Sequence, residues 1–150
     1  MSLQPEKRKY TWAESLFEWS FMTLSWNLFS RANSVWNVML QHVDWKEDSM
    51  IITFQKHKGD QTGEGLSNDK HVYANPRMPE ICPILALAVL VFSIHRGTEI
   101  RQQQLFLGKD SESRFSRVFR TVLSLIPPSI DLGATKRDIG THSNRKGFMM

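Results

Sequence analysis

The chain has 150 residues, 41% of them hydrophobic, which is enough to bury the core of one globular domain and excludes a disordered chain. Its 19 basic and 15 acidic residues give a net charge of +4, a mild excess that is compatible with a polyanionic partner without requiring one. The single cysteine, Cys82, excludes an internal disulfide and a zinc site built from cysteines, and it suits a reducing compartment.

The start of the chain and its most apolar run argue against export and against a membrane span. Residues 1–11 are polar and basic and lack the apolar segment of a signal peptide. The run ILALAVLVF, residues 84–92, is about half of the ~20 residues that a transmembrane helix needs, so it predicts a buried helix instead. We therefore expect no membrane partner.

The first part of the chain predicts helices. From Trp12 onward the apolar residues are dense enough for a helix that is covered on most sides. Steps of four, three and four then predict one face of a helix, formed by Leu28, Ala32, Val35 and Met39. Arg31 lies beside this face, so it is predicted at the edge of the core. The tryptophans are interpreted as core residues rather than as stacking platforms for bases: Trp12, Trp19, Trp26, Trp36 and Trp45.

A β-hairpin is predicted next. WKEDS is typical of a turn, and MIITFQKHK, residues 50–58, alternates as a strand does, with Met50, Ile52 and Phe54 on one face. By the same parity Lys56 and Lys58 continue that face. The loop GDQTGEGLSND and the returning strand KHVYANP complete the hairpin, which would carry both lysines near its tip.

The second part of the chain predicts further helices. One begins near Pro83, because proline suits the first turn of a helix, and it ends near Gly97. SESRFSRVFRTVLSL predicts another, capped by Ser111 and stopped by the two prolines that follow it. Its arginines, spaced by three, are interpreted as a solvated face, although they could follow a DNA backbone: Arg114, Arg117 and Arg120. A last helix begins at Thr141 or Ser143. The predicted fold class is α+β, mainly α, with a small antiparallel sheet.

Basic side chains from three segments could together bind a phosphodiester: Arg31, Lys56 or Lys58, and His142 with Arg145. His142 and Arg145 form a His-x-x-Arg pair, which alone is weak evidence, because an ordinary helix start gives the same spacing. Two guanidinium groups and an ammonium group around one point would neutralise the non-bridging phosphate oxygens. A histidine could move protons, and a lysine could protonate a leaving sugar oxygen. The sequence lacks a clustered Asp/Glu set of the kind that holds Mg²⁺, so we expect metal-free chemistry and no cofactor.

Four segments, in the order TLSWNLFSRANSVWNVMLQHVDW, HKGDQTGEG, HVYANPRMPEICPILALA and GTHSNRKG, resemble the catalytic domain of tyrosine recombinases. These are phage-integrase-like enzymes, and the chain is most similar to their Crypton-like eukaryotic branch, which belongs to mobile elements. The resemblance covers residues 12–150, after a polar lead-in of residues 1–11. It implies an integrase-like DNA breaking-rejoining core that is incomplete at its C-terminus. It also implies double-stranded DNA and other recombinase protomers as partners, no small-molecule cofactor, and a nuclear location.

The resemblance assigns roles to single positions. Arg31 matches the family's first catalytic arginine, and Lys58 best matches its hairpin lysine, with Lys56 as a one-register alternative. His142 and Arg145 match the His-x-x-Arg box, whose arginine is the second phosphate clamp. The further DNA contacts that we expect are Lys56, His57 and Lys146.

In the family, DNA integration and recombination proceed through a 3′-phosphotyrosine, and the tyrosine lies downstream of the box. Only five residues follow Arg145 here, and the two tyrosines, Tyr10 and Tyr73, lie upstream. We therefore expect a DNA-binding catalytic-domain fragment that holds phosphate but lacks the nucleophile and is inactive alone. The alternative is a domesticated, non-enzymatic module that derives from a mobile element and binds DNA or protein.

Overall fold

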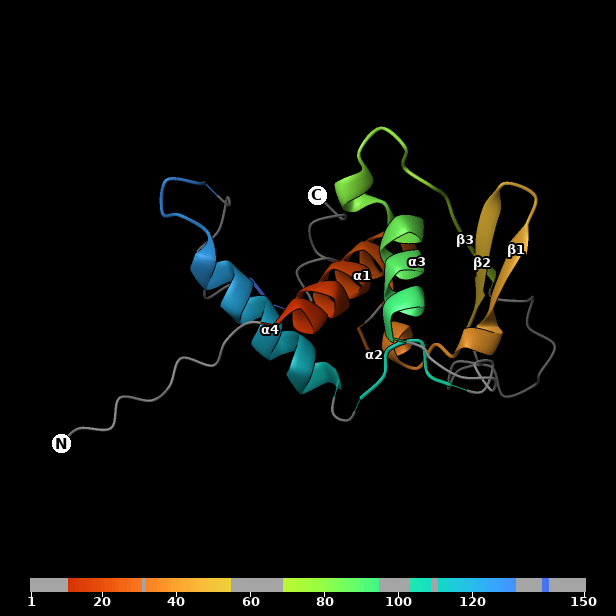
Figure 1. The fold of residues 1–150 in the computed structure, drawn as a ribbon, viewed down its shortest axis with the longest axis horizontal. Coiled ribbons are helices and arrows are strands. Elements are labelled where there is room, and N and C mark those ends of the chain that lie inside the picture. The colour runs from red at the N-terminus through yellow and green to blue at the C-terminus, as the bar shows by residue number, and fades with distance from the viewer. Residues whose placement is uncertain are drawn as a thin grey trace.

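The computed structural model of the protein describes residues 11–30, 32–54, 69–94, 103–108, 111–131 and 139–140. Within these ranges the helices are α1 (Trp12–Leu28), α2 (Ala32–Trp36), α3 (Pro83–Ile94) and α4 (Ser111–Leu125), with two short 3₁₀ helices, η1 (Leu40–His42) and η2 (Pro79–Ile81). The strands β1 (Val43–Lys46), β2 (Ser49–Thr53) and β3 (Asp69–Val72) form one antiparallel sheet in the order β1-β2-β3. Figure 1 shows the sheet at one side of the helices. The predicted α+β, mainly helical class is confirmed for the described residues.

Helix α1 begins at Trp12, as predicted, because a capping box starts it. The Thr11 hydroxyl accepts a hydrogen bond from the Glu14 N–H at 3.2 Å, and the Glu14 carboxylate accepts one from the Thr11 N–H at 3.1 Å. This reciprocal pair satisfies two backbone donors that a helix start leaves unpaired. The cap fixes the first turn of the central helix.

The prediction of one helix face that runs from Leu28 to Met39 is wrong. Helix α1 ends because Phe29 adopts the left-handed conformation, with φ of 48°, and donates its N–H to the Trp26 carbonyl. The chain then forms the short helix α2, and Met39 forms an isolated β-bridge with Gln104. Leu28 is nevertheless buried in the core. The prediction that it faces the core is therefore right, although the helix to which it was assigned is wrong.

The sheet confirms the predicted apolar face of the hairpin. Met50 and Ile52 are buried, and Phe54 packs against the core beyond the end of β2. Strand β1 was not predicted. It pairs with β2 across a two-residue turn in which Glu47 adopts a positive φ of 54°, and three of its four residues are exposed, so its sequence carries little apolar alternation.

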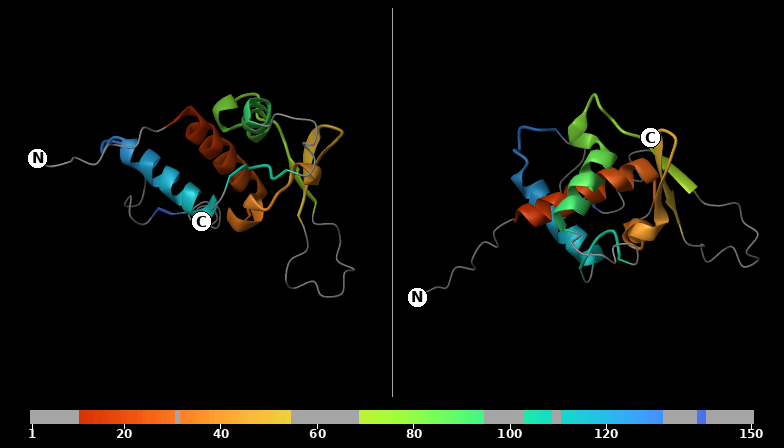
Figure 2. Two further views of the ribbon diagram at one scale, coloured as in Figure 1. Left: turned by 60° about the horizontal axis from the view of Figure 1, so that its bottom comes forward. Right: turned by 45° about the vertical axis from the view of Figure 1, so that its right-hand side comes forward.

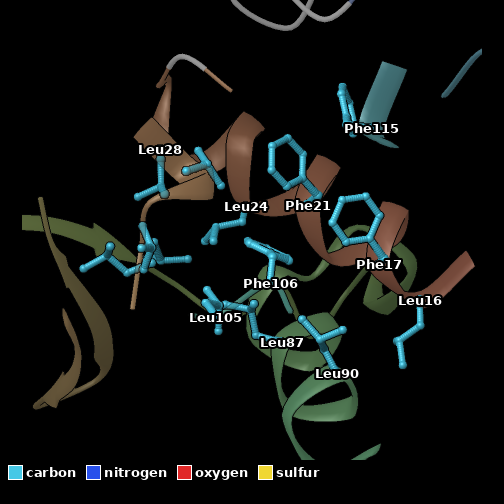
Figure 3. Packing of buried hydrophobic residues seen from close by; sticks show 14 of the residues in the cluster. Leu16, Phe17, Phe21, Leu24, Leu28, Leu87, Leu90, Leu105, Phe106 and Phe115 are labelled. Carbon is cyan, nitrogen blue, oxygen red and sulfur yellow. The ribbon is translucent and has the colours of Figure 1, made fainter. Parts of the chain in front are cut away.

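The core lies where α1 packs between α3 and α4 (Figure 2). Phe106 occupies its centre, with its ring centroid 5.7 Å from that of Phe17 and 5.2 Å from that of Phe21. Phe115 of α4 adds a ring 4.6 Å from Phe21. Figure 3 shows Phe106 between these phenylalanines and the leucines of α3. The residues 103–108, which contain Phe106, thus join the helices into one core.

Helices α3 and α4 begin and end close to their predicted places, with α4 ending at Leu125, just before the two prolines. The prediction that residues 84–92 are buried is only partly right. Leu87 and Leu90 are buried against α1, but Leu85 and Phe92 are 40% and 87% exposed on the opposite side. No helix in the described ranges combines the length and the apolar character that crossing a membrane requires.

Cys82 closes the start of α3. Its thiol is buried, and Sγ accepts hydrogen bonds from the Asn75 N–H at 3.3 Å and from the Leu85 N–H at 3.4 Å. The side chain thereby caps the first turn of α3 and fixes it to the segment that follows β3.

The prediction that all five tryptophans belong to the core is wrong for three of them. Trp12, Trp26 and Trp45 are 64%, 49% and 54% exposed. Trp19 and Trp36 are half-buried and pack against the core cluster, as predicted. The exposed indoles have to be explained by something other than core packing.

Candidate nucleic-acid interface

All residues that the sequence predicts for the site lie outside the described residues: Arg31, Lys56, His57, Lys58, His142, Arg145 and Lys146. The predicted cap at Ser111 and the predicted last helix from Thr141 or Ser143 also lie outside the described side chains and ranges. The structure does describe the residues that flank the three segments in which these predicted site residues lie.

The first segment is position 31, which lies between two buried anchors. Leu28, at the end of α1, is 2% exposed, and Val35, in α2, is fully buried. Ser30 is half-buried, and its hydroxyl donates a hydrogen bond to the Leu28 carbonyl at 3.0 Å. The backbone on both sides of Arg31 is therefore held by the core.

The second segment, residues 55–68, connects β2 with β3 and contains the predicted lysines. Thr53 and Asp69 are partners in the antiparallel register, and the Thr53 hydroxyl donates to the Asp69 carboxylate at 2.8 Å. Phe54 packs against the core cluster at the point where this connection begins. Both ends of the connection are thus fixed at one end of the sheet.

The third segment follows Ile139, which packs against the same core cluster. His142 lies three residues further along the chain. Leu28, Phe54 and Ile139 therefore anchor the approach to each group of predicted site residues on a single hydrophobic cluster.

Helix α4 presents part of the described basic surface. Arg117 and Arg120 are exposed, whereas Arg114 is half-buried: its guanidinium carbon lies 4.1 Å from the centre of the Phe17 ring, and its Nη1 donates to the Leu107 carbonyl at 2.8 Å. Burial lowers the pKa of Arg114, an effect that the negative charge of Glu14 opposes. The predicted solvated face is confirmed for Arg117 and Arg120 and wrong for Arg114, which ties α4 to α1 and to residues 103–108.

Sequence reasoning missed a polar pair on the sheet. His71 Nδ1 lies 2.8 Å from the Ser49 hydroxyl, and the His71 ring stacks on Tyr73 with centroids 6.4 Å apart. The Ser49 hydroxyl also lies 3.2 Å from the Lys46 carbonyl, and the tautomer of His71 decides which group donates in the Ser49–His71 bond. The alternation of KHVY, which places His71 and Tyr73 on one face, was the available signal.

Among the described side chains, no three of His, Cys, Asp or Glu come together as a metal site would require. No protein-family model matches this chain, and no curated protein matches it.

Proposed function

We propose that the chain is part of a tyrosine-recombinase-like catalytic domain of the Crypton-like branch, with an integrase-like fold, and that it binds double-stranded DNA in the nucleus. The observation that carries this proposal is the shared anchoring of three distant segments. The approaches to Arg31, to the Lys56–Lys58 pair and to His142 all start from one core cluster. Side chains that are far apart in the sequence can then meet around one phosphate.

The order of elements also supports the proposal. A helix precedes Arg31, a connection between neighbouring antiparallel strands contains the lysines, and helices precede the His-x-x-Arg box. Each proposed contact suits an anion. Arg31 and Arg145 stay charged at any working pH, and a planar guanidinium group can donate paired hydrogen bonds to phosphate oxygens. Lys58 adds a compact positive charge. Arg117 and Arg120 on α4 supply further exposed cations for the DNA backbone.

The proposal predicts a loss of DNA affinity when a clamp arginine is removed. Arg31→Gln and Arg145→Gln should each weaken binding of a duplex about tenfold, the expected effect of losing a hydrogen bond to a charged group. Each should also lower the slope of log affinity against log salt by about one. Fluorescence anisotropy with a labelled duplex measures both quantities.

Arg77→Gln is the matched control, because Arg77 is exposed and belongs to the turn before η2, outside the three proposed segments of the sequence. It changes the net charge equally and should leave the affinity within about twofold. Equal losses for all three variants would mean that only the total charge matters, and the proposed clamp would have to be abandoned.

The 150-residue chain should form no covalent adduct with a nicked duplex substrate, because no tyrosine follows Arg145. Tyr73, the tyrosine that the structure describes, stacks on His71 just after β3. Denaturing electrophoresis with labelled DNA tests the prediction, and an adduct that maps to either tyrosine of the chain would contradict it.

A further inference from the structure

Helix α1 buries two polar side chains on one side, Glu18 and Ser25, which are 6% and 5% exposed. Their spacing of seven residues places them about two turns apart on the same side of the helix. Phe21 lies between them, and its ring contacts that of Phe115 in α4, with centroids 4.6 Å apart (Figure 3). We call Glu18, Phe21 and Ser25 the Glu18 strip.

The Ser25 hydroxyl is a buried polar group that the described residues leave unsatisfied. Other buried hydroxyls of α1 are bonded: Ser20 donates to the Ala86 carbonyl at 2.9 Å, and Thr23 donates to the Trp19 carbonyl at 2.8 Å. The Ser25 Oγ has no hydrogen-bond partner among the described residues. Since buried polar groups in native proteins are nearly always hydrogen-bonded, a further polar group belongs beside this strip.

Glu18 gives the strip a buried acidic group. A carboxylate that is removed from water stays charged when a cation and hydrogen bonds compensate it. The described arginines of the neighbouring helix α4 lie elsewhere: Arg114 rests on the Phe17 ring, and Arg117 and Arg120 are exposed. The strip therefore points to a cation from a segment outside the described residues.

The end of the chain has the right chemistry for this place. Ile139 packs against the core cluster that includes Phe21, so residues 141–150 begin close to the same core. Their sequence, THSNRKGFMM, contains a histidine, an arginine and a lysine but no acidic residue, and it complements a buried carboxylate. Ten residues can span up to about 33 Å, which is longer than the strip.

We propose that residues 141–150 dock on the Glu18 strip and that the Arg145 guanidinium group pairs with the Glu18 carboxylate. Arginine suits this position better than Lys146 or His142, because it stays charged when water is removed. Its planar group also donates two parallel hydrogen bonds to a carboxylate. A polar group of the same segment then bonds the Ser25 hydroxyl.

The pair makes Glu18 a positioning residue for the proposed phosphate clamp. A guanidinium group has five N–H donors, so two can bond Glu18 while others stay available for a phosphate oxygen. This positioning role rests on the proposed DNA binding, whereas the pairing itself does not. Thermal stability therefore reports the pairing, and DNA affinity reports the positioning.

Arg145→Gln would leave the Glu18 carboxylate buried without its cation, so it should lower the melting temperature by at least about 5 °C. The double variant Glu18→Gln/Arg145→Gln replaces the ion pair by two neutral amides, and it should recover most of that loss. Lys146→Gln is the matched control, because it removes the adjacent charge, and it should lower the melting temperature by no more than about 2 °C. Thermal unfolding followed by circular dichroism measures all three.

Two outcomes of these measurements would overturn the pairing. One is a double variant that is no more stable than Arg145→Gln. The other is a loss in Lys136→Gln, Arg137→Gln or His142→Gln that Glu18→Gln recovers, because Glu18 would then pair with that residue instead.

The direction of the Ser25→Ala effect tests the docking independently. If a polar group of the terminal segment bonds the hydroxyl, alanine leaves that group unpaired and should lower the melting temperature by at least about 2 °C. Ser20→Ala is the reference, since the Ser20 hydroxyl bonds the Ala86 carbonyl. A Ser25→Ala variant as stable as the wild type, or more stable, would contradict the docking, because removal of an unsatisfied hydroxyl costs nothing.

Glu18→Gln separates positioning from plain electrostatics. Removal of a negative charge should by itself favour duplex binding slightly, whereas a misplaced Arg145 should weaken it about fivefold. Glu80→Gln is the matched control, since Glu80 is exposed on η2, and it should leave the affinity within about twofold. Glu18→Asp keeps the charge and should recover part of the affinity. Fluorescence anisotropy with a labelled duplex measures these changes.

Equal duplex affinities of Glu18→Gln and Glu80→Gln would overturn the positioning role. A wild-type chain that binds no duplex would contradict the proposed function and the positioning role with it. The pairing of Glu18 with Arg145 is decided in either case by the melting temperatures, which require no DNA.

Discussion

Replacing Phe106 by alanine is expected to lower the free energy of unfolding by about 3–5 kcal/mol, the usual cost of deleting a buried phenylalanine ring. Phe106 is 1% exposed, and its ring contacts Phe17 and Phe21 of α1 and stacks near Trp36 of α2. Since these partners belong to different helices, they cannot all move into the space that the ring leaves. Urea denaturation followed by circular dichroism measures the change.

Phe92→Ala is the control for this prediction. Phe92 is 87% exposed at the outer side of α3, so its replacement should change the free energy of unfolding by no more than about 0.5 kcal/mol. If the two variants were equally stable, residues 103–108 would not hold the helices together. The anchoring of the three candidate segments on one cluster would then lose its physical basis.

Raising the monovalent salt concentration from about 50 mM to about 200 mM is expected to weaken duplex binding about a hundredfold. The reason is that Arg31, Lys58, Arg145 and Lys146 together would neutralise four phosphates, and each contact releases condensed counterions. Titration of the anisotropy signal at several salt concentrations gives the slope. A non-ionic osmolyte at matched osmolality serves as the control, and it should leave the affinity nearly unchanged.

Two results would contradict the salt prediction. Affinity that does not change with salt would mean that the phosphates are not contacted. No DNA retention at low salt would favour the alternative of a domesticated protein-binding module.

The sequence predicted those elements that local patterns specify. The helix from Trp12, the alternating face of β2 and the helix that ends before the two prolines are all confirmed within the described ranges. In each case the signal, an apolar period or a helix-breaking residue, lies within the element or close to its end.

The misses depend on tertiary contacts. The segment LFSRAN contains no glycine or proline that would indicate the end of α1, yet Phe29 adopts a left-handed conformation there. Strand β1 exists because β2 pairs with it, and only one of its residues, Val43, is even half-buried. Such features follow from packing and not from local preference.

Two of the three misread tryptophans have a related cause. Apolar residues on nearly every side of α1 favoured a fully covered helix, so Trp12 and Trp26, which are exposed, did not stand out from the core positions. The catalytic assignment, which lies outside the described residues, stays a prediction from the family resemblance.

The buried thiol of Cys82, which caps α3, can report how often this part of the protein opens locally. A thiol reagent can reach this buried sulfur only when the first turn of α3 separates from the segment around Asn75. The chain has no other cysteine, so every labelling event reports the same opening reaction. The labelling rate, followed by mass spectrometry, would therefore show how often the start of α3 opens far enough to expose the Cys82 thiol, and no engineered probe is needed.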